Sequence, residues 1–477
     1  MIFYPRVRVN LVVNTGRNIL LRKVSVFTFL VVMASLISIP QAQSVTPKAG
    51  KNCMQAGVTA VANSKTFKCI RSGKKLVWSK GTETIPKSTQ PTPKNKVSLE
   101  EFVKQAVELN SSADNEIPQL DTSKSVKIKK VGSNLLSNFV TANSKKSFSF
   151  LGPTPLAETS SGLTGALSLV TKDQRAVYGS QAALPPWAAT FLFTTKDPQG
   201  RFMVATSGQS NQGDQNYSWR LAFKTSTSAW RYQSISGTTH ATDGKKNFDE
   251  VSLGGPGSYS LRLEFDRSTT FYGIGISDKV TSISTEDTSS TLRVLILGDS
   301  WVYPVIDEAM PSHVWDAFPG ALSWLTGWNV ISTGVRGQGY LQQSAGEKYK
   351  NRVVRDLVPQ NPDVVIFTGS PNDHCPSCSF TDQQIAKEMG IAIKSLKQAN
   401  PDILIIVCSP FEGSSTQAQA MQDVAVAAGV SFIDFVNLPL FNAANNGQRQ
   451  LSNGHPTRLG GSYIAAQLLK EIAALKN

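Results

Sequence analysis

Acidic residues are scarce at the start of this chain of 477 residues. Residues 1–42 contain five basic side chains and no acidic one, and residues 43–97 contain eleven basic side chains and only Glu83. The formal net charge of +14 therefore belongs to these two segments, and residues 98–477 are close to neutral. An enzyme of nucleic acids would need a basic face on its main domain, so no nucleic-acid partner is expected. Since 40% of the residues are hydrophobic, the chain as a whole is not disordered.

Long hydrophobic runs are also scarce. The single extended run, from Val24 to Ile39, follows two basic residues and is followed by Pro-Gln-Ala. It is shorter than the roughly 20 residues that span a bilayer. This pattern predicts a signal peptide over residues 1–42, cleaved after Ala42, with an uncleaved anchor as the alternative. The mature protein is then secreted, extracellular or associated with the cell surface.

The chain has only five cysteines. Cys53 and Cys69 flank a short segment that is too small to bury much surface, so we expect a disulfide between them. Cys375 and Cys378 form a CxxC sequence that lacks further metal ligands at suitable spacing, which favours a small loop disulfide. Cys408 lies in an apolar run and is expected to be a buried thiol. No metal and no cofactor are predicted.

The first part of the chain divides by composition. Residues 43–80 form a small basic module, and residues 81–97 form a linker rich in Pro, Thr and Lys. Their charge is suited to an anionic cell-wall or membrane surface, although a solvated spacer is equally ordinary. Residues 98–110 fit an amphipathic helix capped by Ser98, and the rest of the segment 98–150 is polar and predicted to be an irregular connector.

Residues 151–290 change to short alternating runs between Gly, Ser, Asn and Asp clusters. Six runs predict strands: ATFLFTT, RFMVATSG, WRLAFKT, WRYQSIS, YSLRLEFD and TFYGIGIS. Such a series indicates a β-sandwich or jelly roll. Trp187, Trp219 and Trp230 are candidates for stacking on sugar rings, but the interpretation as core residues is favoured.

Residues 291–477 alternate apolar strands with helical stretches. LRVLILGDS, PDVVIFTGSPND and DILIIVCSPF are apolar throughout, and amphipathic segments follow them. Strands that are apolar on both faces predict a parallel sheet in a three-layer α/β/α domain of the flavodoxin-like kind. Ligands of such sheets bind at the carboxyl ends of the strands.

Four short sequences stand at or near those ends, and each carries a polar group or glycine suited to acyl transfer. Ser300 follows the first strand, Gly337 lies in a glycine-rich loop, Asn372 follows a later strand, and His455 precedes the last helix. The alternatives to a catalytic function are structural ones, namely a helix cap, plain turns and an ordinary loop. Only His455, among four histidines, lies between the last strand and the last helix.

In this order, GDSW, GVRGQGY, GSPND and NGHPT resemble the blocks of the SGNH (GDSL-type) hydrolase family. The resemblance covers residues 291–477 and implies that Ser300 attacks an ester carbonyl and that His455 is the general base. It further implies an oxyanion hole formed by the Ser300 backbone N–H, Gly337 and Asn372. A β-sandwich ahead of this domain is similar to two-domain carbohydrate esterases, which deacetylate polysaccharides.

The last block departs from the family at one position. The aspartate that usually stands three residues before the histidine is Ser452 here. Loss of this charge in a related triad costs on the order of 10⁴ in rate. We expect a Ser–His dyad in which Ser452 or a main-chain oxygen orients His455. Asp434 is a second candidate for this role, although a structural function at its strand end is favoured.

These observations predict a secreted esterase that removes acetyl or other short acyl groups from a polysaccharide. One alternative is a lipid or aryl esterase with an apolar cleft lined by four tryptophans, Trp301, Trp315, Trp324 and Trp328, for which a core position is again favoured. Another is a catalytically degenerate protein that binds cell-wall glycans. The sequence predicts no oligomeric state.

Overall fold

The computed structural model describes a large part of the chain in two units, Met1–Thr92 and Pro93–Asn477. The described residues are 48–53, 56, 59–62, 65–73, 75–80, 82–83, 97–111, 117–123, 125–153, 155–157, 167–168, 186–207, 219–234, 246–265, 269–286, 291–302, 314–342, 348–374, 378–438 and 455–476. The expected signal peptide, residues 1–42, lies outside them. Across these described ranges, every helix is too short or too polar to cross a bilayer.

The first unit contains a small antiparallel sheet. Its described strands are β1 (Thr59–Ala62), β2 (Lys65–Ser72), β3 (Lys75–Trp78) and β4 (Thr82–Glu83). β2 pairs with the other three. Cys69, in β2, forms a disulfide with Cys53, which confirms this predicted bridge. Because the module has little apolar surface, the bridge replaces part of the core that a larger domain would have.

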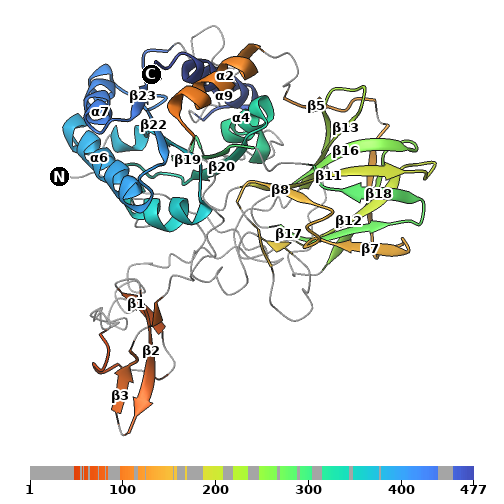
Figure 1. Cartoon of the computed structure of the whole chain (residues 1–477), viewed down its shortest axis with the longest axis horizontal. Helices are drawn as coiled ribbons and strands as arrows, with labels where there is room; N and C mark the ends of the chain where they lie inside the picture. Colours follow the sequence, from red (N-terminus) through yellow and green to blue (C-terminus); the bar gives the residue numbers. More distant parts are fainter. Residues whose placement is uncertain are drawn as a thin grey trace, which may run out of the picture. The chain divides into compact units, whose positions relative to one another are not determined.

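The second unit contains two mostly antiparallel sheets that pack face to face as a β-sandwich (Figure 1). The strands of one sheet run in the order β6-β15-β12-β17-β10-β9, with β7 on β17, and those of the other in the order β18-β11-β16-β13-β14-β5, with β8 on β11. Their bounds are β5 Gln119–Leu120, β6 Lys127–Val131, β7 Asn138–Thr141, β8 Ser149–Leu151, β9 Leu156–Ala157, β10 Leu167–Ser168, β11 Trp187–Thr195, β12 Arg201–Ser207, β13 Trp219–Thr225, β14 Arg231–Ser234, β15 Asn247–Ser252, β16 Gly257–Phe265, β17 Thr270–Ile276 and β18 Val280–Ser284.

Each of the six runs predicted as strands forms one, namely β11, β12, β13, β14, β16 and β17. Their inward side chains form an aromatic and aliphatic core between the sheets. Trp187 and Trp219 lie in it with 0% and 1% exposure, as the core interpretation expects. Trp230 packs edge-on against Trp324 with ring centroids 5.1 Å apart.

The prediction of an irregular connector within residues 98–150 is wrong. Strands β5 to β8, all between Gln119 and Leu151, hydrogen-bond to the sandwich sheets, so the sandwich begins well before residue 151. These strands have two to five residues, and β6 has the sequence KIKKV with mostly exposed side chains. Lysines are typical of edge strands, and in such short segments they hide the alternation that marks a half-buried strand.

The C-terminal domain contains a parallel sheet with the strand order β20-β19-β21-β22-β23. The strands are β19 (Arg293–Gly298), β20 (Asn329–Gly334), β21 (Val364–Thr368), β22 (Leu404–Cys408) and β23 (Ser431–Ile433). The first strand in sequence lies between the second and the third, as in flavodoxin-like folds. This order confirms the predicted fold class and brings the ends of β19, β20 and β21 together.

Helices cover both faces of this sheet (Figure 1). The helical elements are α2 Leu99–Ser111, η1 Val314–Asp316, α4 Phe318–Thr326, α5 Tyr349–Arg352, η2 Val353–Leu357, η3 Val358–Gln360, η4 Pro371–His374, α6 Asp382–Ala399, α7 Ser415–Ala427 and α9 Arg458–Ala473. One apolar core joins the sheet to α2, α4 and α9, and a second joins it to α6 and α7. Helix α2 precedes the sandwich in sequence, but its Phe102 stacks on Trp328 of the C-terminal domain. Its cap is the predicted one, because Ser98 Oγ accepts a hydrogen bond from the Glu101 N–H.

Candidate active site

A serine and a histidine that are 155 positions apart in sequence meet at the carboxyl end of β19. Ser300 Oγ and His455 Nε2 are 2.8 Å apart, a hydrogen-bonding distance for a nucleophile and its base. Ser300 follows β19 by two residues, and His455 precedes α9 by three. Both side chains are half-buried. The arrangement can transfer a proton from the serine hydroxyl to the imidazole.

Another described histidine has a different environment. His374 Nε2 lies 3.0 Å from a carboxylate oxygen of Asp382, at the start of α6. His240 and His313 lie outside the described residues. His455 is thus the described histidine that contacts Ser300.

The loop after β20 carries Gly337, which has a φ of +67° that glycine adopts without strain. The Val335 N–H donates to the Gly298 carbonyl, so this loop is tied to the end of β19. Arg352, which is fully buried, donates to the Gln338 side chain at 3.0 Å and to the Thr333 carbonyl. These bonds hold the loop beside the strand end that leads to Ser300.

Asn372 lies in η4, after β21. Its side-chain Nδ2 has three acceptors near it: Asp299 Oδ2 at 3.2 Å, the Gln338 carbonyl at 3.1 Å and Ser370 Oγ at 3.0 Å. The three loops that follow β19, β20 and β21 therefore meet at this amide. The side chain is half-buried, as expected for a group at the rim of a site.

Asp299 is a further site residue, not among those predicted from the sequence, and it directly precedes Ser300 in GDSW. It is 1% exposed, and its partners are the Trp301 N–H at 2.9 Å, Ser370 Oγ at 2.5 Å and Asn372. No positively charged group is among these partners. Burial raises the pKa of Asp299 to about 6.

The hydroxyl of Ser370 lies close to the Asp299 carboxyl. Its single hydroxyl hydrogen faces two oxygens, the Gln338 carbonyl at 2.8 Å and Asp299 Oδ2. The hydrogen bond that the Ser370 hydroxyl donates to Asp299 favours the ionised carboxylate, so it acts against the effect of burial on the pKa. With a pKa of about 6, the Asp299 carboxyl is mostly protonated below that pH and mostly ionised above it.

Asp373 fixes the second half of the glycine-rich loop. Its carboxylate accepts hydrogen bonds of 2.8–2.9 Å from the backbone N–H groups of Tyr340, Leu341 and Gln342. Burial raises its pKa, and these three bonds act in the opposite direction. Gly339 permits this close approach, because a Cβ at this position would lie 2.4 Å from the carboxylate.

Of the two candidates for orienting His455, the structure describes Asp434 and not Ser452. Asp434 follows β23, and its carboxylate accepts hydrogen bonds from Ser409 Oγ and the Val436 N–H, both at 3.0 Å, and from the Asn437 amide. These bonds secure the turn after β23, which is the structural function favoured for this residue. Ser452 lies outside the described residues.

The remaining cysteines and possible metal ligands do not extend the site. Cys378 is disulfide-bonded, and its expected partner Cys375 lies outside the described residues. Cys408 is a free, fully buried thiol, as predicted. Among the side chains that the structure describes, no three from His, Cys, Asp and Glu are grouped so that they could hold a metal ion.

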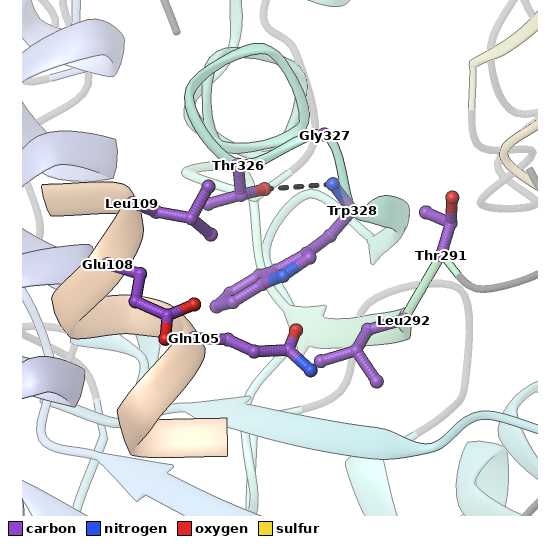
Figure 2. A pocket seen from close by; sticks show the side chains of 8 residues that line it. All are labelled: Gln105, Glu108, Leu109, Thr291, Leu292, Thr326, Gly327 and Trp328. Atoms are coloured by element: carbon purple, nitrogen blue, oxygen red, sulfur yellow. Dashed lines mark hydrogen bonds between the residues drawn. The ribbon is translucent and has the colours of Figure 1, made fainter. Parts of the chain in front are cut away.

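A pocket of about 440 Å³ lies at the amino ends of the strands, opposite to the end that carries Ser300 (Figure 2). It is located between α2 and the residues that precede β19 and β20, and its lining residues are Gln105, Glu108, Leu109, Thr291, Leu292, Thr326, Gly327 and Trp328. The Thr326 hydroxyl accepts a hydrogen bond from the Trp328 N–H on one wall. Because Ser300 follows the carboxyl end of β19, this pocket is distinct from the candidate active site.

The C-terminal domain matches a known family. Residues 296–461 match the GDSL-like lipase/acylhydrolase family. This segment begins within β19 and includes Ser300, Gly337, Asn372 and His455. The chain therefore carries a carboxylic ester hydrolase domain with the SGNH fold. No curated protein matches the sequence.

Several solved structures are similar over most of their own length. A salicylyl-acyltransferase from a tetracycline biosynthetic pathway has a TM-score of 0.50 and 12% identity, over 71% of this chain and 98% of that one. A family two carbohydrate esterase from Clostridium thermocellum, solved with cellohexaose, has a TM-score of 0.46 and 14% identity, over 62% and 94%. One from Cellvibrio japonicus has a TM-score of 0.43 and 12% identity, over 73% and 99%.

Proposed function

Because residues 296–461 form a domain of the GDSL-like lipase/acylhydrolase family, we propose that this protein is a secreted serine esterase that removes acetyl or other short acyl groups from a polysaccharide. The observation that supports this proposal best is the distance of 2.8 Å between Ser300 Oγ and His455 Nε2. Nucleophile and base are thus within proton-transfer distance at the carboxyl edge of a parallel sheet, where such folds bind their ligands.

In the proposed reaction, Ser300 Oγ attacks the ester carbonyl carbon while its proton moves to His455 Nε2. The tetrahedral intermediate collapses as His455 returns this proton to the sugar oxygen that leaves, and an acyl-serine forms. Water then attacks the acyl-serine with His455 again as base, and the carboxylic acid is released. No cofactor is needed for these steps.

The negative charge on the carbonyl oxygen is assigned to three donors: the backbone N–H groups of Ser300 and Gly337, and the Asn372 side chain. Donors fixed in advance are the main source of stabilisation in such oxyanion holes, and loss of one costs about 10²–10³ in rate. The Asn372 amide also donates to the Asp299 carboxyl at 3.2 Å, and this bond fixes the orientation of the amide.

The imidazole of His455 must be held in the tautomer that leaves Nε2 free to accept the proton. We assign this function to Ser452 Oγ or to a main-chain oxygen near Nδ1, which completes a Ser–His dyad. The engagement of Asp434 by Ser409, Val436 and Asn437 supports this choice over a triad that uses Asp434.

A sugar ester fits better than a lipid or aryl ester. The four tryptophans that could have lined an apolar acyl cleft are at most 7% exposed. Trp301 and Trp328 lie in the core of the C-terminal domain, and Trp315 and Trp324 pack against the β-sandwich. A β-sandwich joined to an SGNH domain also resembles two-domain carbohydrate esterases. The basic residues 43–97 and the expected signal peptide fit a protein at an anionic cell surface.

The test is hydrolysis of p-nitrophenyl acetate by the chain from residue 43 onward, compared with Ser300→Ala and His455→Ala. We expect both substitutions to reduce kcat by at least about 10³-fold. Ser452→Ala is expected to lower kcat by about tenfold or more if its hydroxyl orients the ring, and to have little effect if a main-chain oxygen does. Asp434→Asn is the matched control, expected to retain activity.

Substrate class is tested separately. Acetylated polysaccharide is expected to release acetate, and p-nitrophenyl esters of long acyl chains are expected to react more slowly than the acetate. Turnover that is independent of Ser300 and His455 contradicts the proposal. Binding of polysaccharide by inactive Ser300→Ala, without any hydrolysis by the wild type, favours the glycan-binding alternative.

A further inference from the structure

Arg458 links the helix that follows His455 to the β-sandwich. It is the first residue of α9, three positions after His455. The residue before it, Thr457, caps the helix by accepting a hydrogen bond of 3.1 Å from the Gly460 N–H. Only Pro456 separates His455 from this capped turn. The position of the imidazole therefore depends directly on where α9 begins.

The guanidinium of Arg458 reaches two elements on the sandwich side. It donates to the hydroxyl of Tyr232, in β14, and to the carbonyl of Pro118, just before β5, at 2.8 Å. It also lies over the Tyr232 ring, 4.7 Å from the centroid. The Tyr232 side chain is itself 8% exposed and is stacked by Arg220, so it offers a fixed surface.

The same guanidinium is held from the C-terminal domain. Arg458 Nε lies 3.5 Å from Asp316 Oδ1, in η1. The first turn of α9 contacts η1 closely, because a Cβ at Gly461 would lie 2.8 Å from the Asp316 carbonyl oxygen. We call Arg458, Tyr232, Pro118 and Asp316 the Arg458 clamp. It fixes the start of α9 against both domains.

We propose that the β-sandwich acts in catalysis by positioning His455 through the Arg458 clamp; this inference rests on the proposed esterase function. Proton transfer requires the contact between His455 and Ser300 to be kept within a few tenths of an ångström, and a shift of about 1 Å costs on the order of 10²-fold in rate. The sandwich is therefore a part of the catalytic unit, and Arg458 and Tyr232 are positioning residues.

The test uses the full mature chain with Arg458→Met, Arg458→Lys and Tyr232→Phe. For hydrolysis of p-nitrophenyl acetate, we expect Arg458→Met to lower kcat by about 10- to 100-fold with KM changed less than about twofold. Arg458→Lys keeps a cation beside Asp316 and is expected to recover part of this loss. Tyr232→Phe keeps the ring and removes the acceptor, so we expect a smaller loss.

A matched control separates positioning from stability. Arg201→Gln breaks an ion pair of 3.2 Å with Asp197 inside the sandwich, far in sequence from α9. It is expected to lower Tm while kcat stays within about twofold of the wild type. In the double variant Tyr232→Phe/Arg458→Met, we expect no further loss of kcat beyond that of Arg458→Met, since both changes remove one clamp.

The outcomes are distinct. Unchanged kcat in Arg458→Met, or a loss of kcat in Arg201→Gln as large as in Arg458→Met, overturns the inference. Fully additive losses in the double variant also contradict a shared clamp. If the wild type itself shows no activity that depends on Ser300, the proposed esterase function fails instead, and the clamp variants are then not needed to decide it.

Discussion

Buried carboxylates have different partners in two regions of the molecule. Where the sandwich contacts the C-terminal domain, arginines face Glu264 and Asp316. Near Ser300, neutral donors face Asp299 and Asp373. Glu264 accepts hydrogen bonds from Arg220 and from the Trp324 indole N–H, and Asp316 accepts one of 2.6 Å from Arg220. Near Ser300, the donors are hydroxyl, amide and backbone N–H groups.

The two buried arginines at the domain contact, Arg220 and Arg262, differ in the direction in which their pKa is shifted. Burial opposes the charge of Arg220, but Glu264 and Asp316 outweigh it and raise its pKa. For Arg262 burial dominates and lowers the pKa to about 10, while its guanidinium is stacked between Trp315 and Trp324 at 4.1 and 4.0 Å. At the domain contact, then, buried negative charge is balanced by cations.

The comparison shows two ways of burying a carboxyl group. A cation keeps the group ionised and makes the contact permanent over a wide pH range, which suits an interface that holds two domains together. Asp299 has only neutral donors as its described partners, so burial raises its pKa to about 6 and its charge depends on the pH.

The largest effect on stability is expected from removing a cation at the contact between the two domains. Arg220→Met removes the cation that Glu264 and Asp316 share, and it leaves Glu264 with Arg262 at 3.0 Å and Asp316 with Arg458 at 3.5 Å. Breaking a buried ion pair from one side costs about 3–5 kcal/mol, and we expect a loss of this size in the free energy of unfolding by urea. Lys350→Met, which breaks an ion pair of 2.8 Å with Glu388 nearer the surface, is the control and should cost less than about 1 kcal/mol. Equal losses in the two variants would show that Glu264 and Asp316 do not depend on the Arg220 cation.

Much of the fold was predictable because its main strands are rich in apolar residues. The parallel strands of the C-terminal domain are buried on both faces, and the main sandwich strands alternate clearly, so both signals are local in the sequence. Strands β5 to β8 were not predictable for the opposite reason. They are short and polar, and they become strands only by pairing with longer neighbours.

The candidate site was predictable only in its motifs. Ser300, Gly337, Asn372 and His455 stand in recognisable blocks, and the strand order that brings the first three together follows from the fold class. The state of Asp299 and the contact of Arg458 with Tyr232 depend on side chains that are distant in sequence. Nothing local identifies such partners.

The second prediction concerns Asp299. A carboxyl group whose pKa is higher in the folded chain binds its proton more tightly there, so its contribution to stability is present below about pH 4 and is lost as the pH rises through about 6. With about 1.4 kcal/mol per pKa unit, the loss is on the order of 3 kcal/mol. Asp299→Asn imitates the neutral acid and should remove this part of the pH dependence.

The measurement is the free energy of unfolding of both proteins between pH 4 and pH 8. The wild type is expected to lose stability relative to Asp299→Asn as the pH rises. Parallel curves for the two proteins would show that Asp299 is ionised throughout, and the contrast between the two regions would then be wrong.

The smallest effect is expected from Gly339→Ala. Here the new Cβ would lie 2.4 Å from the Asp373 carboxylate, which three backbone N–H groups hold in place. Either the carboxylate or the loop must move, and overpacking of this kind costs about 1–3 kcal/mol. Gly132→Ala meets no atom within 4 Å and is the matched control, with an expected change below about 0.5 kcal/mol. Because the displaced loop also carries Gly337, kcat should fall in Gly339→Ala and not in Gly132→Ala. A loss of stability without a loss of kcat would mean that Asp373 supports the fold alone, and that Asp299 is the one buried acid of this pair that acts at the site.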